Sequence, residues 1–228
     1  MPQKSAGKHH LHRKRSMAGW SGVFMLEARG LRYGYKRDQP LFHNLSITIA
    51  PGEIVGLSGQ SGTGKTTLAK LLAGFAKPDA GHILLDGHAL PASGVHPVQL
   101  VLQHPEHAVN PRWKMKKILA EGGGAGHNFL ETLGISRAWL ERYPRELSGG
   151  ELQRFCLARA LGSAADYLIA DEMTTMLDAV TQAQIWEAVL HMRNEWGFGV
   201  LAISHDQALL KRVADRLVSF PELLQPAD

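Results

Sequence analysis

The stretch Gly59-Gln60-Ser61-Gly62-Thr63-Gly64-Lys65-Thr66 fits the phosphate-binding pattern G-x-x-x-x-G-K-[ST]. It follows the short apolar run Ile54–Ser58, which predicts a buried strand, and it opens a helical pattern over residues 65–75. A glycine-rich loop in this context lets backbone N–H groups surround phosphate oxygens, and the helix N-terminus adds unpaired donors. We therefore expect a nucleotide site in which Lys65 contacts the β- and γ-phosphates and Thr66 ligates Mg²⁺.

A second segment, Tyr167-Leu168-Ile169-Ala170-Asp171-Glu172, supplies carboxylates after four apolar residues. The apolar run predicts a buried strand, and ligands of open α/β sheets lie at the carboxyl ends of strands. We expect Asp171 to belong to the Mg²⁺ shell and Glu172 to orient or deprotonate an attacking water. An acidic pair after a strand is often only a solvated loop, so this interpretation depends on the phosphate loop.

The remaining patterns predict an α/β fold. Alternation in residues 26–35 and 45–50 predicts antiparallel strands, and a strand–helix alternation that implies a parallel sheet follows. Residues 113–146 are expected to be mostly helical, with an interruption at residues 122–124. Further predicted strands are 82–85, 98–102, 200–203 and 216–220, and further predicted helices are 149–161, 181–196 and 207–213.

Composition limits the class of protein. The 228 residues are 44% hydrophobic and include one cysteine, Cys156, which excludes an intramolecular disulfide framework. The sequence has no run of about 18 consecutive apolar residues, so it predicts no membrane-spanning helix. Residues 1–16 hold five of the 25 basic residues and no acid, so residues 17–228 hold 20 basic and 21 acidic residues and carry a net charge of −1. We therefore expect residues 1–24 to be a disordered basic tail, a tag or a stretch upstream of a start at Met17 or Met25.

The segment Leu147-Ser148-Gly149-Gly150-Glu151 indicates a family. Together with Leu152-Gln153-Arg154 and Ala158-Arg159-Ala160-Leu161, it resembles the signature and signature helix of the ATP-binding-cassette (ABC) ATPases. The resemblance covers nearly all of residues 25–220. It implies a P-loop NTPase fold, an ABC nucleotide-binding domain over residues 25–228 with an N-terminal antiparallel β subdomain and a short helical subdomain, about 104–160, inserted in the core.

The signature is a second anion site at a predicted helix N-terminus. Because the chain already has a phosphate loop, a second phosphate site suggests a partner. The resemblance implies that two cassettes, identical or homologous, pack head to tail and that each signature closes on the γ-phosphate held by the other.

Other positions match the family one at a time. Gln103 resembles the Q-loop glutamine, which contacts Mg²⁺ or the water, and His205 the switch histidine, which hydrogen-bonds the γ-phosphate. Asp178 resembles the D-loop aspartate. Tyr35 resembles the aromatic residue that stacks on adenine, with Tyr33 as a rival.

The resemblance therefore implies ATP and Mg²⁺ as cofactors. The expected catalytic residues are Glu172, His205 and Gln103. The expected metal ligands are Thr66, Gln103 and Asp171. The expected nucleotide-binding residues are Gly59, Gln60, Ser61, Gly62, Thr63, Gly64, Lys65, Thr66, Thr67, Tyr35, Ser148, Gly149, Gly150, Glu151 and Asp178.

Two segments depart from the family pattern. Met173 replaces the proline that usually follows the glutamate, and Thr175-Met176 replaces Ser-Ala before Leu177-Asp178. Neither departure removes a group that must ligate phosphate or metal, so they put in doubt only the detailed geometry across the dimer.

One branch of the family matches further. Val109-Asn110-Pro111-Arg112, at its distance after Gln103, and Tyr143-Pro144-Arg145-Glu146-Leu147 resemble the ATPases of peptide and nickel importers. The resemblance implies an ATP-hydrolysing subunit of a multi-subunit importer for nickel, metal chelates or peptides. It implies transmembrane permease subunits, an extracytoplasmic substrate-binding protein and a peripheral location at the cytoplasmic face of the bacterial inner membrane. His104 and His107 are not expected to bind nickel, because the family's ATPase does not touch cargo.

Two alternatives lie outside transport. A nucleic-acid-associated cassette would carry long coiled-coil inserts, whereas about 80 residues without sustained heptads separate the phosphate loop from the signature. The charge of −1 on residues 17–228 likewise predicts no nucleic-acid partner. A regulatory cassette such as a translation factor usually carries two cassettes in one chain.

Overall fold

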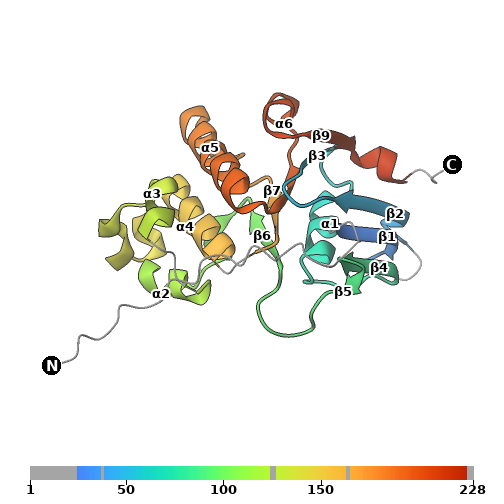
Figure 1. The fold of residues 1–228 in the computed structure, drawn as a ribbon, viewed down its shortest axis with the longest axis horizontal. Coiled ribbons are helices and arrows are strands. Elements are labelled where there is room, and N and C mark those ends of the chain that lie inside the picture. The colour runs from blue at the N-terminus through green and yellow to red at the C-terminus, as the bar shows by residue number, and fades with distance from the viewer. Residues whose placement is uncertain (1–24, 37–38, 124–126, 163–164, 225–228) are drawn as a thin grey trace.

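A computed structural model describes residues 25–36, 39–123, 127–162 and 165–224. The stretch predicted to be a basic tail or tag, residues 1–24, therefore lies outside the described residues. Two sheets form the body (Figure 1), a four-stranded sheet of order β2-β1-β4-β5 and a five-stranded sheet of order β6-β7-β8-β3-β9. Within the described residues, no helix is both long and apolar enough to cross a bilayer.

The four-stranded sheet is antiparallel. Its strands are β1 (Leu26–Tyr33), β2 (Phe42–Ile49), β4 (Ala80–Leu85) and β5 (His88–Ala89). Leu45, Ile47 and Ile49 are buried while their neighbours in the strand are exposed, so β2 has one face on the core. β2 begins three residues before the predicted start, because Phe42 already pairs with Tyr33.

The five-stranded sheet is parallel, as the strand–helix alternation predicts. Its strands are β3 (Ile54–Ser58), β6 (Val98–Leu102), β7 (Tyr167–Asp171), β8 (Gly199–Ile203) and β9 (Arg216–Ser219). Every residue of β7 and β8 is buried, which explains why both read as unbroken apolar runs. The carboxyl ends of β3, β6, β7 and β8 lie at one edge, and the candidate site residues follow these ends.

Each face of the parallel sheet has its own core. Leu57, Ile169 and Ile203 pack with α1 (Lys65–Leu72) and the antiparallel sheet. Leu168 and Ala202, one residue earlier in their strands, pack with α4 (Gly149–Gly162), α5 (Ala179–Trp196) and α6 (Gln207–Val213) on the other face. The period of two in the strands therefore divides the apolar residues between the two layers.

The chain between β6 and β7 forms a separate group of helices at one end of the molecule (Figure 1). It holds α2 (Met115–Glu121), α3 (His127–Thr132) and α4, with the short 3₁₀ turns η1 (Pro105–His107), η2 (Arg137–Glu141) and η3 (Pro144–Glu146). It leaves and returns to neighbouring strands, since Leu102 of β6 pairs with Asp171 of β7.

Within the described part of residues 113–146, the predicted helical stretch is divided into two short α-helices and two 3₁₀ turns, with a break after α2. Pro144 cannot continue a helix from its N-terminal side, and Gly134 has a φ of +62°, which ends the turn after α3. A side chain at Gly122 would overlap the carbonyl of Arg159, so α2 ends where it meets α4.

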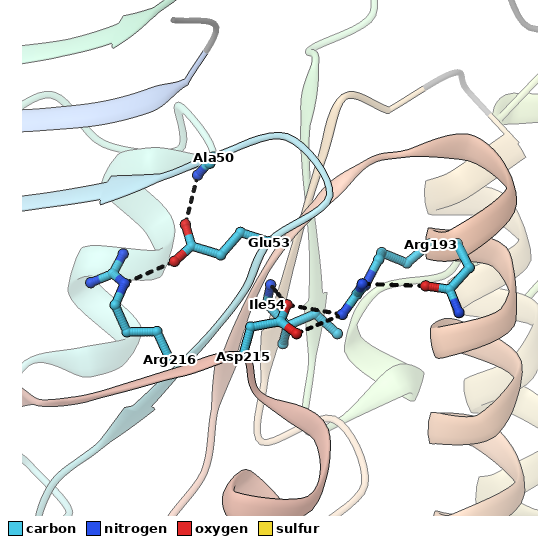
Figure 2. A network of polar contacts seen from close by, with 7 residues as sticks. Ala50, Glu53, Ile54, Arg193, Asp215 and Arg216 are labelled. Carbon is cyan, nitrogen blue, oxygen red and sulfur yellow. Dashed lines mark hydrogen bonds and ion pairs between the residues drawn. The ribbon is translucent and has the colours of Figure 1, made fainter.

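A polar network fastens the amino ends of the parallel strands (Figure 2). Asp215 accepts from the amide of Ile54 at 2.8 Å and pairs with Arg193 of α5 at 2.9 Å. Glu53 joins Arg216 at 2.8 Å and accepts from the amide of Ala50 at 2.8 Å. These contacts join both sheets and α5 at the end of the sheet opposite to the candidate site. The last element that the structure describes is η4 (Phe220–Leu224), which packs against β2.

Candidate functional site

The phosphate loop is a compact turn held by its own lysine. Nζ of Lys65 donates to the carbonyl of Gly59 at 2.8 Å and to that of Gln60 at 2.7 Å. Thr63 also donates to the Gln60 carbonyl, at 2.8 Å. Gly64 has a φ of +113°, and a Cβ there would lie 2.9 Å from Cδ2 of Leu41, so this position requires glycine. An ammonium has three N–H donors, and these two bonds leave one for a phosphate oxygen.

A cavity of about 330 Å³ opens beside this loop at the carboxyl edge of the parallel sheet. It joins the loop to the ends of β6 and β7, and ten of the predicted site residues line it. These are Tyr35, Ser61, Gly62, Gly64, Lys65, Thr66, Thr67, Gln103, Asp171 and Glu172. The loop itself contains Gly59, Gln60 and Thr63. The carbonyls of Gly59 and Gln60 accept from Lys65, and the Gln60 carbonyl also accepts from the Thr63 hydroxyl, which holds the loop in shape.

The two carboxylates differ in environment. Asp171, the last residue of β7, is buried, and burial raises the pKa of its carboxyl group while a hydrogen bond to Thr66 and the charge of Lys65 lower it. Glu172 has a φ of +50°, a conformation that non-glycine residues rarely adopt, and its amide donates to the Ile203 carbonyl at 3.0 Å. The backbone turn at Glu172 brings its side chain to the cavity beside Asp171.

The donor set fits Mg²⁺. The carboxylate of Asp171 and the hydroxyl of Thr66 line the same cavity, and both are hard oxygen donors. Among the described residues no group of three or more His, Cys, Asp or Glu side chains is arranged to hold a metal. A site with one carboxylate and one hydroxyl leaves the remaining positions to phosphate oxygens and water, which is how Mg²⁺ binds beside nucleotides.

His205 lies beside Glu172 but is not among the residues that line the cavity. Its Nδ1 is 3.6 Å from Oε2 of Glu172, and its side chain is 55% exposed. The next residue, Asp206, caps α6 by accepting from the amides of Ala208 and Leu209 at 2.9 and 3.0 Å. The histidine therefore follows β8 on a short segment that is fixed at both ends.

Tyr35 covers the cavity, whereas Tyr33 does not line it. The Tyr35 hydroxyl lies 2.9 Å from Oγ1 of Thr67, although 72% of the residue is exposed. The ring of Tyr33 packs edge-on against that of Tyr35, with 5.5 Å between the ring centroids. It also packs, at a tilt, against the ring of Phe42, with 6.3 Å between the centroids. Strand β1 ends at Tyr33, two residues before the predicted end, so Tyr35 belongs to the following loop. This geometry favours Tyr35 over Tyr33 as the aromatic residue that meets a bound base.

The signature residues begin α4 in a reciprocal cap. The amide of Ser148 donates to Oε2 of Glu151 at 2.7 Å, and the amide of Glu151 donates to Oγ of Ser148 at 3.3 Å. A side chain at Gly150 would lie 2.7 Å from Cγ2 of Thr181, so glycine lets α4 approach α5. Asp178 caps α5 through the amides of Val180 and Thr181, both at 3.0 Å, and the bond from the Thr181 hydroxyl lowers its pKa.

The signature lies apart from the phosphate loop. Ser148, Gly149, Gly150, Glu151 and Asp178 line a second, open cavity of about 1010 Å³ between α4 and α5. No residue lines both cavities. The described residues of a single chain thus form two separate half-sites, one with the phosphate loop and one with the signature.

Some lining residues were not expected from the sequence. Leu41 joins Tyr35 at the first cavity, and Trp139, Arg154 and Thr181 line the second. Leu41 precedes β2 and belongs to no motif, so only the structure shows that it lines the cavity. Arg154 donates to the Leu133 carbonyl at 2.7 Å and to Gln184 at 2.7 Å, which ties α4 to its neighbours.

Comparison with known proteins identifies the family. The model of the "ABC transporter" family matches residues 42–175. The nickel import ATP-binding protein NikE of Escherichia coli (strain K12) is 34% identical over 217 residues, which cover 87% of this chain and 81% of that protein. A putative peptide import ATP-binding protein of Brucella ovis is 32% identical over 216 residues, 85% of this chain and 68% of that protein.

Solved structures agree on the fold. A dimeric bacterial ABC transporter cassette superposes with a TM-score of 0.73 at 21% identity, over 85% of this chain and 93% of that one. The ATP-binding subunit of an ABC transporter superposes with a TM-score of 0.73 at 23% identity, over 86% and 85%. The chain therefore belongs to the ABC transporter family as an ATP-binding protein, an ATPase coupled to transport.

Proposed function

We propose that this chain is the ATP-hydrolysing subunit of a multi-subunit importer for nickel, metal chelates or peptides. The observation that carries the proposal is the meeting of Lys65, Thr66, Gln103, Asp171 and Glu172 at one cavity. These residues come from the phosphate loop and from the ends of β6 and β7, and each brings a group suited to one part of phosphoryl transfer.

The phosphate loop holds the triphosphate. Backbone N–H groups of the loop and the N-terminus of α1 bind the phosphate oxygens, and Lys65 turns its remaining N–H to them. The hydroxyl of Thr66 and the carboxylate of Asp171 hold Mg²⁺, with Gln103 at the same cavity as a further ligand. The bound cation supplies neutralisation of the phosphate charge.

Glu172 acts on the water. Its carboxylate accepts a proton from the attacking water, and His205 stands beside it to donate a hydrogen bond to the γ-phosphate. The left-handed backbone at Glu172 is strain of the kind that folds retain at active sites. Tyr35 presents its ring to the adenine.

The separate signature cavity supports a head-to-tail dimer. Ser148 and the Gly149 and Gly150 amides at the start of α4 can bind an anion, yet they do not line the cavity of their own phosphate loop. In a head-to-tail pair, this surface with Glu151 and Asp178 closes on the γ-phosphate held by the partner cassette, which is identical or homologous. ATP binding then favours the closed pair, and hydrolysis reopens it.

The importer assignment rests on relatives. A nickel import ATP-binding protein and a putative peptide import ATP-binding protein match most of the chain. We infer that transmembrane permease subunits hold the chain at the cytoplasmic face of a bacterial inner membrane, that a substrate-binding protein delivers cargo outside, and that nucleic acid is not a partner.

The test is purification of the tagged full-length chain with its membrane subunits, followed by reconstitution into lipid vesicles with Mg-ATP on the side of the membrane that carries the ATPase and the substrate-binding protein on the other side. We expect uptake of either a nickel chelate or a labelled oligopeptide, and we expect Lys65→Ala to abolish it. An ATPase that brings down no membrane protein, or a complex whose uptake ignores Lys65→Ala, would contradict the proposal.

A further inference from the structure

Three side chains of α4 reach the same short segment after β6. Nε2 of Gln153 donates to the carbonyl of Leu102 at 3.1 Å, and Nη1 of Arg159 donates to that of Ala108 at 2.6 Å. Between them, the Cys156 thiol points its sulfur at the Pro105 carbonyl at 3.7 Å. Donors and acceptors both advance in steps of three, and each pair is 51 residues apart in the sequence. We call Gln153, Cys156 and Arg159 the α4 clamp.

The contacts of the clamp lie on both sides of Gln103 in the sequence. Leu102 precedes this glutamine, and Pro105 and Ala108 follow it, while Gln103 itself lines the cavity beside the phosphate loop. Leu102 is also paired with Asp171 in the parallel sheet, so the chain before Gln103 is fixed to the sheet. Ala108 has a bond to α4. A displacement of α4 relative to the sheet therefore acts on the Gln153–Leu102 bond and on residues 103–108, which lie between the sheet and the Arg159 bond.

The same helix begins at the signature. Gly149 is its first residue and lines the signature cavity, and the clamp residues follow along its length. An α-helix transmits a shift at its N-terminus to the rest of its length because its own hydrogen bonds keep it rigid. Contacts made at Ser148 and Gly149 can therefore move the segment that carries Gln103.

The burial of the clamp shows how closely it is packed. Gln153 is 1% exposed and Cys156 is buried. Within the part of the chain that the structure describes, Oε1 of Gln153 has no hydrogen-bond partner, so its bond to Leu102 is kept at the cost of a buried acceptor. Arg159 also pairs with Glu121 of α2 at 3.5 Å, which extends the contact to a second helix.

We propose that Gln153 and Arg159, with Cys156 between them, are positioning residues that carry movement of the signature helix to Gln103 at the nucleotide. The proposal rests on the proposed ATPase function. When a partner's nucleotide binds at the start of α4, the clamp sets the distance of Gln103 from Asp171 and Glu172, so one half-site senses the occupancy of the other.

The test uses the full-length chain with its membrane subunits and four variants. Arg159→Met and Gln153→Met remove clamp bonds at similar side-chain size, and Arg159→Lys keeps a donor for the Ala108 carbonyl. Arg193→Met is the matched control, because Arg193 is 19% exposed against 25% for Arg159 and pairs with Asp215 at the opposite end of the sheet (Figure 2). The readouts are melting temperature, Kd for Mg-ATP, kcat, and hydrogen–deuterium exchange of peptides over residues 103–108.

We expect Arg159→Met and Gln153→Met to lower kcat about tenfold or more while Kd for Mg-ATP changes less than about twofold, since only the placement of a reacting group is lost. Exchange over residues 103–108 should rise in both, and Arg159→Lys should recover part of kcat. Arg193→Met should lower the melting temperature without raising that exchange.

Two results would overturn the proposal while leaving the ATPase function intact. One is wild-type kcat and exchange in Arg159→Met and Gln153→Met, and the other is a fall in kcat that Arg193→Met reproduces at equal loss of melting temperature. A wild-type complex that neither binds nor hydrolyses Mg-ATP would instead refute the proposed function itself.

Discussion

Oε2 of Glu172 lies 3.6 Å from Nδ1 of His205, although the two residues are far apart in the sequence. They follow the ends of the neighbouring strands β7 and β8, where Asp171 pairs with Ile203. The amide of Glu172 donates to the Ile203 carbonyl at 3.0 Å, so the sheet itself sets the distance between the carboxylate and the imidazole. The proposed base, which lines the cavity, and the proposed hydrogen-bond donor therefore lie next to each other.

Replacement of Glu172 by glutamine should separate binding from hydrolysis. Glutamine keeps the shape of the side chain but cannot accept the proton of the water, and loss of a general base costs about 10²–10⁴-fold in rate. We expect phosphate release to fall by that range while Kd for Mg-ATP stays close to the wild-type value. Glu222→Gln, at a carboxylate that accepts from the Ser219 amide and does not line the cavity, is the control. Phosphate release at the wild-type rate in Glu172→Gln would show that another group activates the water.

Substitutions at Tyr35 should distinguish its ring from its hydroxyl. Stacking of a base on an aromatic ring contributes about 1–3 kcal/mol, so Tyr35→Ala should raise Kd for ATP by about 5- to 150-fold. Tyr35→Phe keeps the ring and loses only the bond to Thr67, so its Kd should remain within about threefold of wild type. Titration with a fluorescent ATP analogue measures both. If Tyr33→Ala weakens binding more than Tyr35→Ala, Tyr33 is the residue that meets the base.

Cys156 should be unreactive in the folded protein. Burial raises the pKa of its thiol to about 11 from an ordinary value of 9.0, so at pH 8 the thiolate that reacts with Ellman's reagent is scarce as well as inaccessible. We expect slow labelling of the native chain and rapid labelling in guanidinium chloride.

The same pKa difference predicts a dependence of stability on pH. The unfolded thiol loses its proton above its ordinary pKa, whereas the folded thiol retains it to a higher pH, so stability is lost as pH rises from about 9 to about 11. Chemical denaturation at pH 8 and pH 10, compared with Cys156→Ala, measures this contribution. Rapid native labelling at pH 8, or an equal pH dependence in Cys156→Ala, would contradict the buried thiol.

The sequence predicted the parts of the fold that depend on short-range patterns. Three elements have the predicted type: the strand before Gly59, the helix after it, and the strand that ends at Asp171. Their type could be predicted because the pattern of apolar residues that sets their burial lies within each short segment. The boundaries moved where tertiary contacts decide them. The helix after the phosphate loop ends at Leu72 rather than at residue 75, since Gly74 takes a φ of +75°.

Other features have no local signal. Leu41 reaches the nucleotide cavity only because β2 lies beside the phosphate loop, and the α4 clamp joins residues 51 positions apart. The separation of the signature from the phosphate loop also depends on how α4 packs against α5. Motifs could thus identify the groups at each half-site, whereas their distribution over two cavities required coordinates.

Ser148→Arg tests whether the two half-sites of one chain act separately. An arginine at the start of α4 fills the surface that would meet the partner's γ-phosphate, but it lies outside the cavity of its own phosphate loop. The measurement is Kd for Mg-ATP and kcat for the same purified variant. The account predicts an unchanged Kd with kcat reduced by about 10²-fold or more, as for loss of a group that stabilises transferred phosphate. An unchanged kcat, or a Kd that rises together with the loss of kcat, would contradict it.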